Sequence, residues 1–166
     1  MYDTDLNITW LANANANGAM NWTAANTWAA GLTVGGFTGW RLPTADPACG
    51  PNNNCVNSEL GHLYYTELGV TQGNAITSSS ASSYLALFTN VQNSIYWSGT
   101  EYAPGSGDAW LFSASNGFQN YFDKDGNFYA WAVRSGDVGS VPEPGVIGLL
   151  GIGALAWAGT RARRRG

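Results

Sequence analysis

The sequence predicts an α+β domain in which two helices pack on antiparallel strands and hairpins. Apolar residues recur at helical spacing over residues 21–32, and a second such pattern follows Ser58. Strand-like segments separated by Asn- and Gly-containing turns then fill residues 95–134. Helices and strands are therefore largely separated along the chain, as in α+β domains rather than parallel α/β domains. An apolar C-terminal segment predicts an additional transmembrane helix.

The first half supplies one strand, two helices and a second short strand. Residues 5–11 alternate apolar and polar side chains and predict a half-buried strand. Residues 21–32 are expected to form the first helix, and residues 39–43 a short strand stopped by proline. Ser58 is expected to cap the second helix, which Gly69 closes.

The second half is predicted to be mostly strand. Four segments rich in aromatic or β-branched residues are predicted strands: 95–102, 109–113, 118–122 and 128–134. The Asn116-Gly117 pair predicts a hairpin between the second and the third of them. The polar stretches 44–57 and 71–83 are expected to be loops.

The charge distribution argues against nucleic acid as a partner. Up to Ser140 the chain has three basic residues against ten acidic ones, a net charge of −7, while four arginines lie in the C-terminal tail. An acidic surface repels phosphate backbones and also disfavours strongly anionic polysaccharides. Eight Trp and eight Tyr supply too much apolar surface for a disordered chain and suit a compact, loop-rich extracellular domain.

The two cysteines, Cys49 and Cys55, lie in the loop sequence CGPNNNC. A metal site would need more ligands nearby, and the lone histidine, His62, follows seven residues later. We expect a local disulfide, as in exported proteins, with free thiols as the alternative. Met1 leads directly into a polar, acidic segment, so we expect the true N-terminus, with a secretory leader, to lie upstream of Met1.

The C-terminus has three parts in a fixed order. The turn Val141, Pro142, Glu143, Pro144 is followed by the uncharged run 145–159 and then by a cluster of arginines. As a helix the run reaches about 22 Å, short of the roughly 30 Å hydrocarbon core, a gap that snorkelling arginines can cover. The arginines place the preceding domain outside the cytoplasmic membrane. The alternative is a buried core helix with a basic tail, although several glycines disfavour it.

This order of parts resembles the PEP-CTERM sorting signal of Gram-negative bacteria. The resemblance implies insertion of residues 145–160 in the cytoplasmic membrane and cleavage near Pro-Glu-Pro by an exosortase-type enzyme. It also implies an exported protein of the cell envelope or extracellular space, in a host that makes exopolysaccharide.

Four motifs carry a second resemblance: YDTDLNITW at 2–10, GWRLPT at 39–44, YWSGT at 96–100 and AWAVR at 130–134. Together they resemble the Lcl C-terminal domain, which implies a C-type-lectin-like fold related to the formylglycine-generating enzyme fold. The family's attributed role is binding sulfated glycans, often as a trimer, but this chain has no collagen-like repeat. We expect the domain over residues 1–136, a linker with the Pro-Glu-Pro motif over 137–144, and the sorting helix with its Arg-rich tail over 145–166.

Polar residues near predicted loop tips are the expected glycan ligands: Glu101, Asp108, Asn116, Asn120 and Asn127. Aromatic residues on the predicted strands are divided between core and binding surface, with Trp40, Trp97 and Trp131 expected in the core. Tyr102, Trp110, Tyr121 and Tyr129 remain open between the two. Arg41 and Arg134 are each expected to pair with a carboxylate such as Glu59 or Glu101.

The segment Asp123, Lys124, Asp125, Gly126, Asn127 resembles the start of a calcium-binding loop. Its glycine comes too early and Arg134 stands where a bidentate Glu belongs, so a plain turn is the better interpretation. We therefore expect no cofactor, with calcium at Asp123, Asp125 and Asn127 as an open alternative. Asp3, Asp5 and Asn7 also alternate along the chain and are a weaker calcium candidate. His62 lacks the surroundings of a catalytic triad and is expected to be a partly exposed helix residue.

These observations favour an exported binding protein for glycan or exopolysaccharide. The alternative is a structural matrix protein without a specific ligand. An enzyme is disfavoured, because the cysteines look structural and a shared fold does not imply shared chemistry.

Overall fold

The computed structural model describes residues 1–139. The predicted sorting motif at Val141–Pro144 and the predicted transmembrane helix at 145–160 lie outside the described residues. Within residues 1–139, no helix is long and apolar enough to cross a membrane.

The domain is α+β, as predicted, and contains two sheets. The first has the order β1-β2-β9-β4 and is antiparallel throughout, with bounds β1 Tyr2–Asp3, β2 Ile8–Trp10, β9 Val133–Ser135 and β4 Trp40–Arg41. The second has the order β3-β8-β5-β6-β7, with bounds β3 Ala19–Met20, β8 Phe128–Tyr129, β5 Ile95–Glu101, β6 Asp108–Ser113 and β7 Phe118–Asp123. One pair departs from the expected antiparallel arrangement, since β5 and β8 are parallel.

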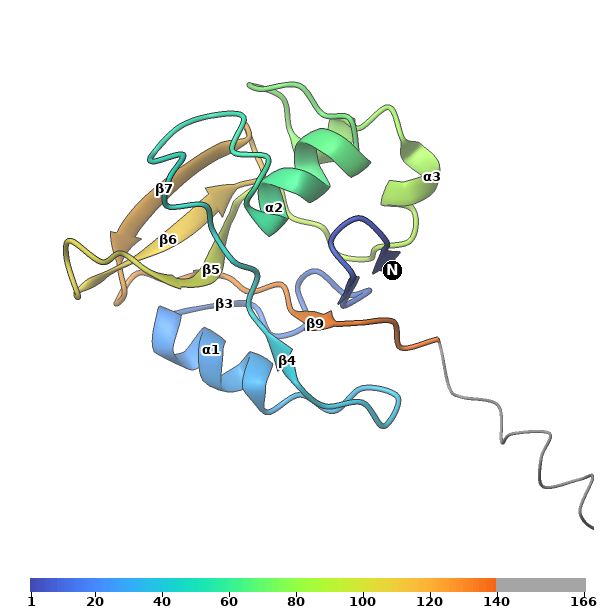
Figure 1. Cartoon of the computed structure of the whole chain (residues 1–166), viewed down its shortest axis with the longest axis horizontal. Coiled ribbons are helices and arrows are strands. Elements are labelled where there is room, and N and C mark those ends of the chain that lie inside the picture. Colours follow the sequence, from blue (N-terminus) through green and yellow to red (C-terminus); the bar gives the residue numbers. More distant parts are fainter. Residues whose placement is uncertain (140–166) are drawn as a thin grey trace, which may run out of the picture.

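The helical segments are short apart from the first. They are α1 Trp22–Ala30, α2 Glu59–His62, the π-helix η1 Leu63–Glu67, the 3₁₀-helix η2 Ile76–Ser78 and α3 Ser82–Leu85. In Figure 1, α1 lies below β3, while α2 lies to the right of β5, β6 and β7 and above β9. Because α1 contacts β4 and β5, it ties the two sheets together.

Both predicted helix starts are confirmed by their caps. The Asn21 side chain accepts a hydrogen bond from the Ala24 N–H at 2.9 Å, and the Ser58 hydroxyl accepts one from the Gly61 N–H at 3.0 Å. Each bond satisfies an N–H group that a helix start leaves without a partner. The second helix closes before Gly69, which has a positive φ of 59°.

The predicted strand 128–134 is wrong in one respect: it is two strands in different sheets. β8 ends at Tyr129 and β9 begins at Val133, and the three residues between them are buried. Trp131 donates its indole N–H to the Leu11 carbonyl at 2.8 Å. The chain thus crosses the core here, where burial on all sides replaces the alternation of a single strand.

Two further expectations are corrected. The strand expected over 5–11 covers Ile8–Trp10 only, and all three residues are buried, with Ile8 and Trp10 in the hydrophobic core. Thr9, expected on a polar face, donates instead to the Gly136 carbonyl at 2.7 Å. The polar stretch 71–83 is not entirely loop, since it contains η2 and the start of α3.

Within residues 1–139, four tryptophans belong to the hydrophobic core: Trp10, Trp40, Trp97 and Trp131. The predicted core residues Trp40, Trp97 and Trp131 are all buried, which confirms that expectation. Trp131 makes edge-to-face contacts with Trp10 and Phe88, with ring centroids 5.2 and 4.8 Å away. Such aromatic pairs add to the stabilisation from area burial alone. This rigid centre holds the loops that form the candidate site.

Candidate functional site

The clearest candidate binding site is a pocket of about 310 Å³ between the cysteine loop and the turn that joins β5 to β6. The pocket is lined by Pro47, Gly50, Pro51, Glu101, Tyr102, Ala103, Pro104 and Trp110. Most of this lining is apolar, with one carboxylate among it. A mainly apolar pocket with a few polar groups is the usual form of a small-ligand site.

One wall of the pocket is the loop closed by the predicted disulfide, which is present between Cys49 and Cys55. Gln119 on β7 fastens this loop to the sheet: its side-chain amide donates to the carbonyls of Asp46 and Gly50 at 2.8 and 3.0 Å. The Gln119 side-chain oxygen accepts from the Asp46 N–H at 3.0 Å. Gln119 is only 1% exposed, so these bonds satisfy a buried amide. The loop is therefore held in a fixed position above β7 (Figure 1).

The opposite side of the pocket rests on an aromatic cluster. Tyr102 stacks on Tyr121 with ring centroids 3.8 Å apart and an angle of 10° between the ring planes. Trp110 meets both rings edge-on, at 5.4 and 5.7 Å. The neighbouring hydroxyl of Tyr121 raises the pKa of Tyr102, with smaller contributions from partial burial and from the Asp108 carboxylate. The Tyr102 hydroxyl therefore stays protonated near neutral pH and can both donate and accept a hydrogen bond.

The charged residue at the pocket, Glu101, pairs with a lysine. Its Oε2 accepts from Lys124 Nζ at 2.5 Å, and the same ammonium donates to the Ser106 carbonyl at 2.6 Å. Lys124 also lies over the Trp22 ring, 4.5 Å from its centroid. These contacts fix Glu101 at the pocket rim, while its side chain stays half exposed.

Of the two expected arginine–carboxylate pairs, one is present among the described residues and the other is not. Arg41 pairs with Glu59, as predicted. Arg134 does not pair with Glu101, whose partner is Lys124. It donates instead to the carbonyls of Thr38 and Ser135, at 2.8 and 3.1 Å.

The five predicted glycan ligands do not form one group. Glu101 lines the pocket, and Asp108 lies next to it, where its carbonyl accepts from the Tyr102 N–H at 3.1 Å. Asn120 follows Gln119 on β7 and so points to the opposite face from Gln119 and the loop that it holds. Asn116 lies in the β6–β7 hairpin and Asn127 in the turn before β8. A binding role for Asn116, Asn120 and Asn127 stays a prediction.

The sequence offered only a partial signal for the pocket. Tyr102 and Trp110 were already open between core and surface, and the structure places both at the pocket. Pro47 and Pro51 were missed. Their position beside two cysteines was the available signal, because a short disulfide-closed loop with prolines is rigid and lies at the surface.

The Asp-rich turn has the geometry of a plain turn. The Asp123 side chain accepts from the Asp125 N–H at 2.8 Å, a local bond typical of Asp in turns. Asp123 is exposed, and Asp125 follows it in the same turn. Calcium binding at Asp123, Asp125 and Asn127 stays a prediction.

Comparison with known proteins identifies two regions. The sequence profile of the family described as Lcl C-terminal domain matches residues 1–134. The profile described as PEP-CTERM protein-sorting motif matches residues 140–165. No curated protein matches the chain.

Proposed function

The chain belongs to the Lcl C-terminal domain family, and from that premise we propose that it is an exported glycan-binding protein processed at its C-terminus. The observation that carries the binding role is the pocket formed by Glu101, Tyr102, Trp110 and the disulfide-closed loop. The proposal also includes the C-type-lectin-like fold that the family implies, and no enzymatic activity.

The sorting motif supports export to the cell envelope, with an exosortase-type enzyme as a processing partner. The disulfide agrees with this location, because such bonds persist outside the reducing cytoplasm. We propose that the apolar run at 145–160 holds the chain in the cytoplasmic membrane until processing.

The chemistry of the pocket favours a sugar. The apolar C–H face of a pyranose ring packs on aromatic rings such as Tyr102 and Trp110, and the hydroxyl groups around its edge need hydrogen-bond partners. Glu101 accepts such bonds, and the Tyr102 hydroxyl both donates and accepts them. Prolines on the facing loop add a rigid apolar wall, which lowers the entropy lost on binding.

The charge of the domain narrows the ligand class. With a net charge of −7 up to Ser140 and a carboxylate in the pocket, the domain repels sulfated chains. We therefore propose a neutral or amine-bearing exopolysaccharide in place of the sulfated glycans attributed to the family.

Titration of the full chain in non-ionic detergent with neutral exopolysaccharide, followed by tryptophan fluorescence, tests the proposal. We expect saturable binding that Tyr102→Ala and Glu101→Gln each weaken about tenfold or more, because each removes a direct contact. Tyr84→Ala is the matched control, since Tyr84 is exposed on α3. Repeating the titration with calcium tests the Asp-rich turn.

A flat response from the folded chain would contradict glycan binding. Equal weakening by Tyr84→Ala would show that binding occurs outside the pocket. The first result would favour the alternative, a structural matrix protein without a specific ligand.

A further inference from the structure

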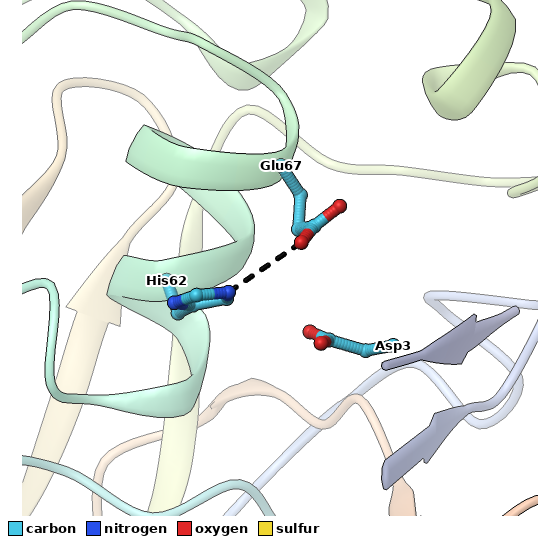
Figure 2. Close-up of side chains that lie close together, drawn as sticks. All are labelled: Asp3, His62 and Glu67. Atoms are coloured by element: carbon cyan, nitrogen blue, oxygen red, sulfur yellow. Dashed lines mark ion pairs between the residues drawn. The ribbon is translucent and has the colours of Figure 1, made fainter. Parts of the chain in front are cut away.

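A second group of side chains, which the proposed function does not use, lies where the N-terminal strand meets the second helix. Asp3 on β1, His62 at the end of α2 and Glu67 at the end of η1 point toward a common space (Figure 2). One ligand atom from each lies within 4.8 Å of the others. In the part of the chain that the structure describes, no other set of three His, Cys, Asp or Glu side chains is so placed.

Asp3 is fixed in this position with one oxygen unused. Its Oδ1 accepts from the N–H groups of Asp5 and Leu6, at 3.1 and 3.0 Å. Its Oδ2 is buried and has no hydrogen-bond partner, and the residue is only 2% exposed. A buried carboxylate oxygen without a partner is costly, so such an atom calls for an explanation.

His62 presents a second unsatisfied atom to the same space. Its Nε2 is buried without a hydrogen-bond partner, 3.4 Å from Glu67 Oε1 and 3.9 Å from Asp5 Oδ2. A protonated imidazole paired directly with a carboxylate would approach to about 2.7–2.9 Å. The observed gaps are wider than those of a direct pair.

The backbone builds this arrangement through a π-turn. The Leu68 N–H donates to the Leu63 carbonyl at 2.9 Å, five residues back, so the helix widens after His62. In a regular α-helix, residues five apart point about 140° away from each other. The wider turn brings His62 and Glu67 to the same side, and π-turns occur frequently at functional sites.

The wider gaps match the spacing of ligands around a metal ion. Ligand atoms about 2.0–2.2 Å from a tetrahedral zinc ion lie roughly 3.3–3.6 Å from one another. The His62–Glu67 distance of 3.4 Å falls in this range, and Asp5, whose side chain is 63% exposed, is free to close the remaining gap. An imidazole among the ligands favours zinc-class transition metals over calcium, which takes oxygen ligands.

The electrostatics also favour a cation. The carboxylates of Asp3, Asp5 and Glu67 surround one imidazole, and among the described residues no Lys or Arg reaches them within 4.0 Å. A divalent ion would compensate this concentration of negative charge and give the unpaired atoms of Asp3 and His62 a ligand role.

We propose that Asp3, His62 and Glu67, with Asp5 as the fourth ligand, form a binding site for a divalent zinc-class metal ion that joins β1 to the α2–η1 helix. Zinc bound here would stabilise the folded chain, because the ligands converge only when the two segments are packed together.

The test uses the full chain, purified in detergent without a histidine tag and stripped with a chelator. We expect it to take up about one equivalent of Zn²⁺, to show the d–d absorption of Co²⁺ held by protein ligands, and to gain about 5 °C or more in Tm at saturating zinc. Asp3→Asn and His62→Gln should each weaken zinc binding at least about 100-fold.

Asp125→Asn is the matched control, because it makes the same change at a carboxylate in the Asp-rich turn and should leave zinc affinity unchanged. Asp3→Asn keeps the oxygen that holds the Asx turn, and Glu67→Gln provides a third variant if either of the other two fails to fold. Absence of zinc uptake by the folded chain would overturn the proposal, as would equal affinity in His62→Gln. A loss in Asp125→Asn alone would overturn it too, by placing the metal in the Asp-rich turn.

Discussion

Arg41 and Glu59 join the first sheet to the second helix through a two-bond ion pair. Arg41 Nη1 donates to Glu59 Oε2 and Nη2 donates to Oε1, both at 2.7 Å. Glu59 Oε2 also accepts from the Thr44 N–H at 2.7 Å. The hydrogen bonds to Glu59 raise the pKa of Arg41, and one carboxylate thereby positions both the end of β4 and the segment that enters α2.

Glu59→Gln should destabilise the folded chain by about 1–3 kcal/mol. The amide cannot accept both guanidinium bonds, so a partly buried charge loses its partner. The expected loss is modest because the Arg41 side chain is 37% exposed and water can solvate part of its charge. Thermal unfolding followed by tryptophan fluorescence measures the change. Asp123→Asn, at an exposed carboxylate, is the control and should shift stability by less than about 0.5 kcal/mol. If Glu59→Gln and Asp123→Asn had equal effects, the Arg41–Glu59 pair would not stabilise the fold as assigned.

Gly61→Ala should destabilise the chain by about 2 kcal/mol or more, since a methyl group has no space there. A Cβ at this position would lie 2.0 Å from the Cys55 carbonyl oxygen and 2.6 Å from the Ser58 hydroxyl that caps α2. The obstacle is backbone, which cannot rotate away. Gly107→Ala meets open space and is the control. If the two variants melted at the same temperature, the loop before α2 would have shifted to make room for the methyl group, and the prediction would be wrong.

Replacing Cys49 and Cys55 together by Ser should lower stability by about 2 kcal/mol, the value expected for releasing a short closed loop. The same change should weaken glycan binding, because Gly50 and Pro51 between the cysteines line the pocket. Unfolding and titration of the double variant measure both effects. If the double variant were less stable but bound glycan with unchanged affinity, the closed loop would not be required for binding.

Stability should fall at alkaline pH because of two buried tyrosines. Burial raises the pKa of Tyr64 and of Tyr96 to about 12, whereas tyrosine in an unfolded chain ionises near about 10. Above a pH of about 10 the unfolded chain loses protons that the folded chain keeps, so this stability is full below that pH and is lost as the pH rises toward about 12. Melting temperatures across this alkaline range check the prediction. Tyr96→Phe should flatten the fall, and an unchanged slope would count against Tyr96 as a source.

The sequence predicted the elements whose signals are local. Helical spacing over residues 21–32 predicted the first helix, Ser58 predicted the start of the second, and the cysteine pair predicted its disulfide. It did not predict the division of 128–134 between two sheets, because continuous burial of the crossing residues looks the same as a buried strand in sequence.

The two candidate sites differ in how far the sequence predicted them. The sequence singled out two aromatic residues of the pocket, Tyr102 and Trp110, as core or binding-surface residues. Which of these two roles each has depends on tertiary packing, which the sequence does not show. The Asp3–His62–Glu67 group was hidden, since α-helical spacing separates residues five apart and Asp3 is distant in the chain. Only the π-turn and the pairing of β1 with β2 bring these side chains together.

Gln119→Leu tests whether the position of the loop controls the pocket. Leucine leaves the carbonyls of Asp46 and Gly50 and the Asp46 N–H without their partner, so we expect a loss of about 2 kcal/mol or more. We also expect weaker glycan binding, although Gln119 does not line the pocket. Gln92→Leu makes the same change at a glutamine whose side chain bonds to the Asn90 carbonyl, outside this loop, and is the control for both measurements. If Gln119→Leu lowers stability but binds glycan like the unaltered chain, the loop reaches its binding position without this clamp.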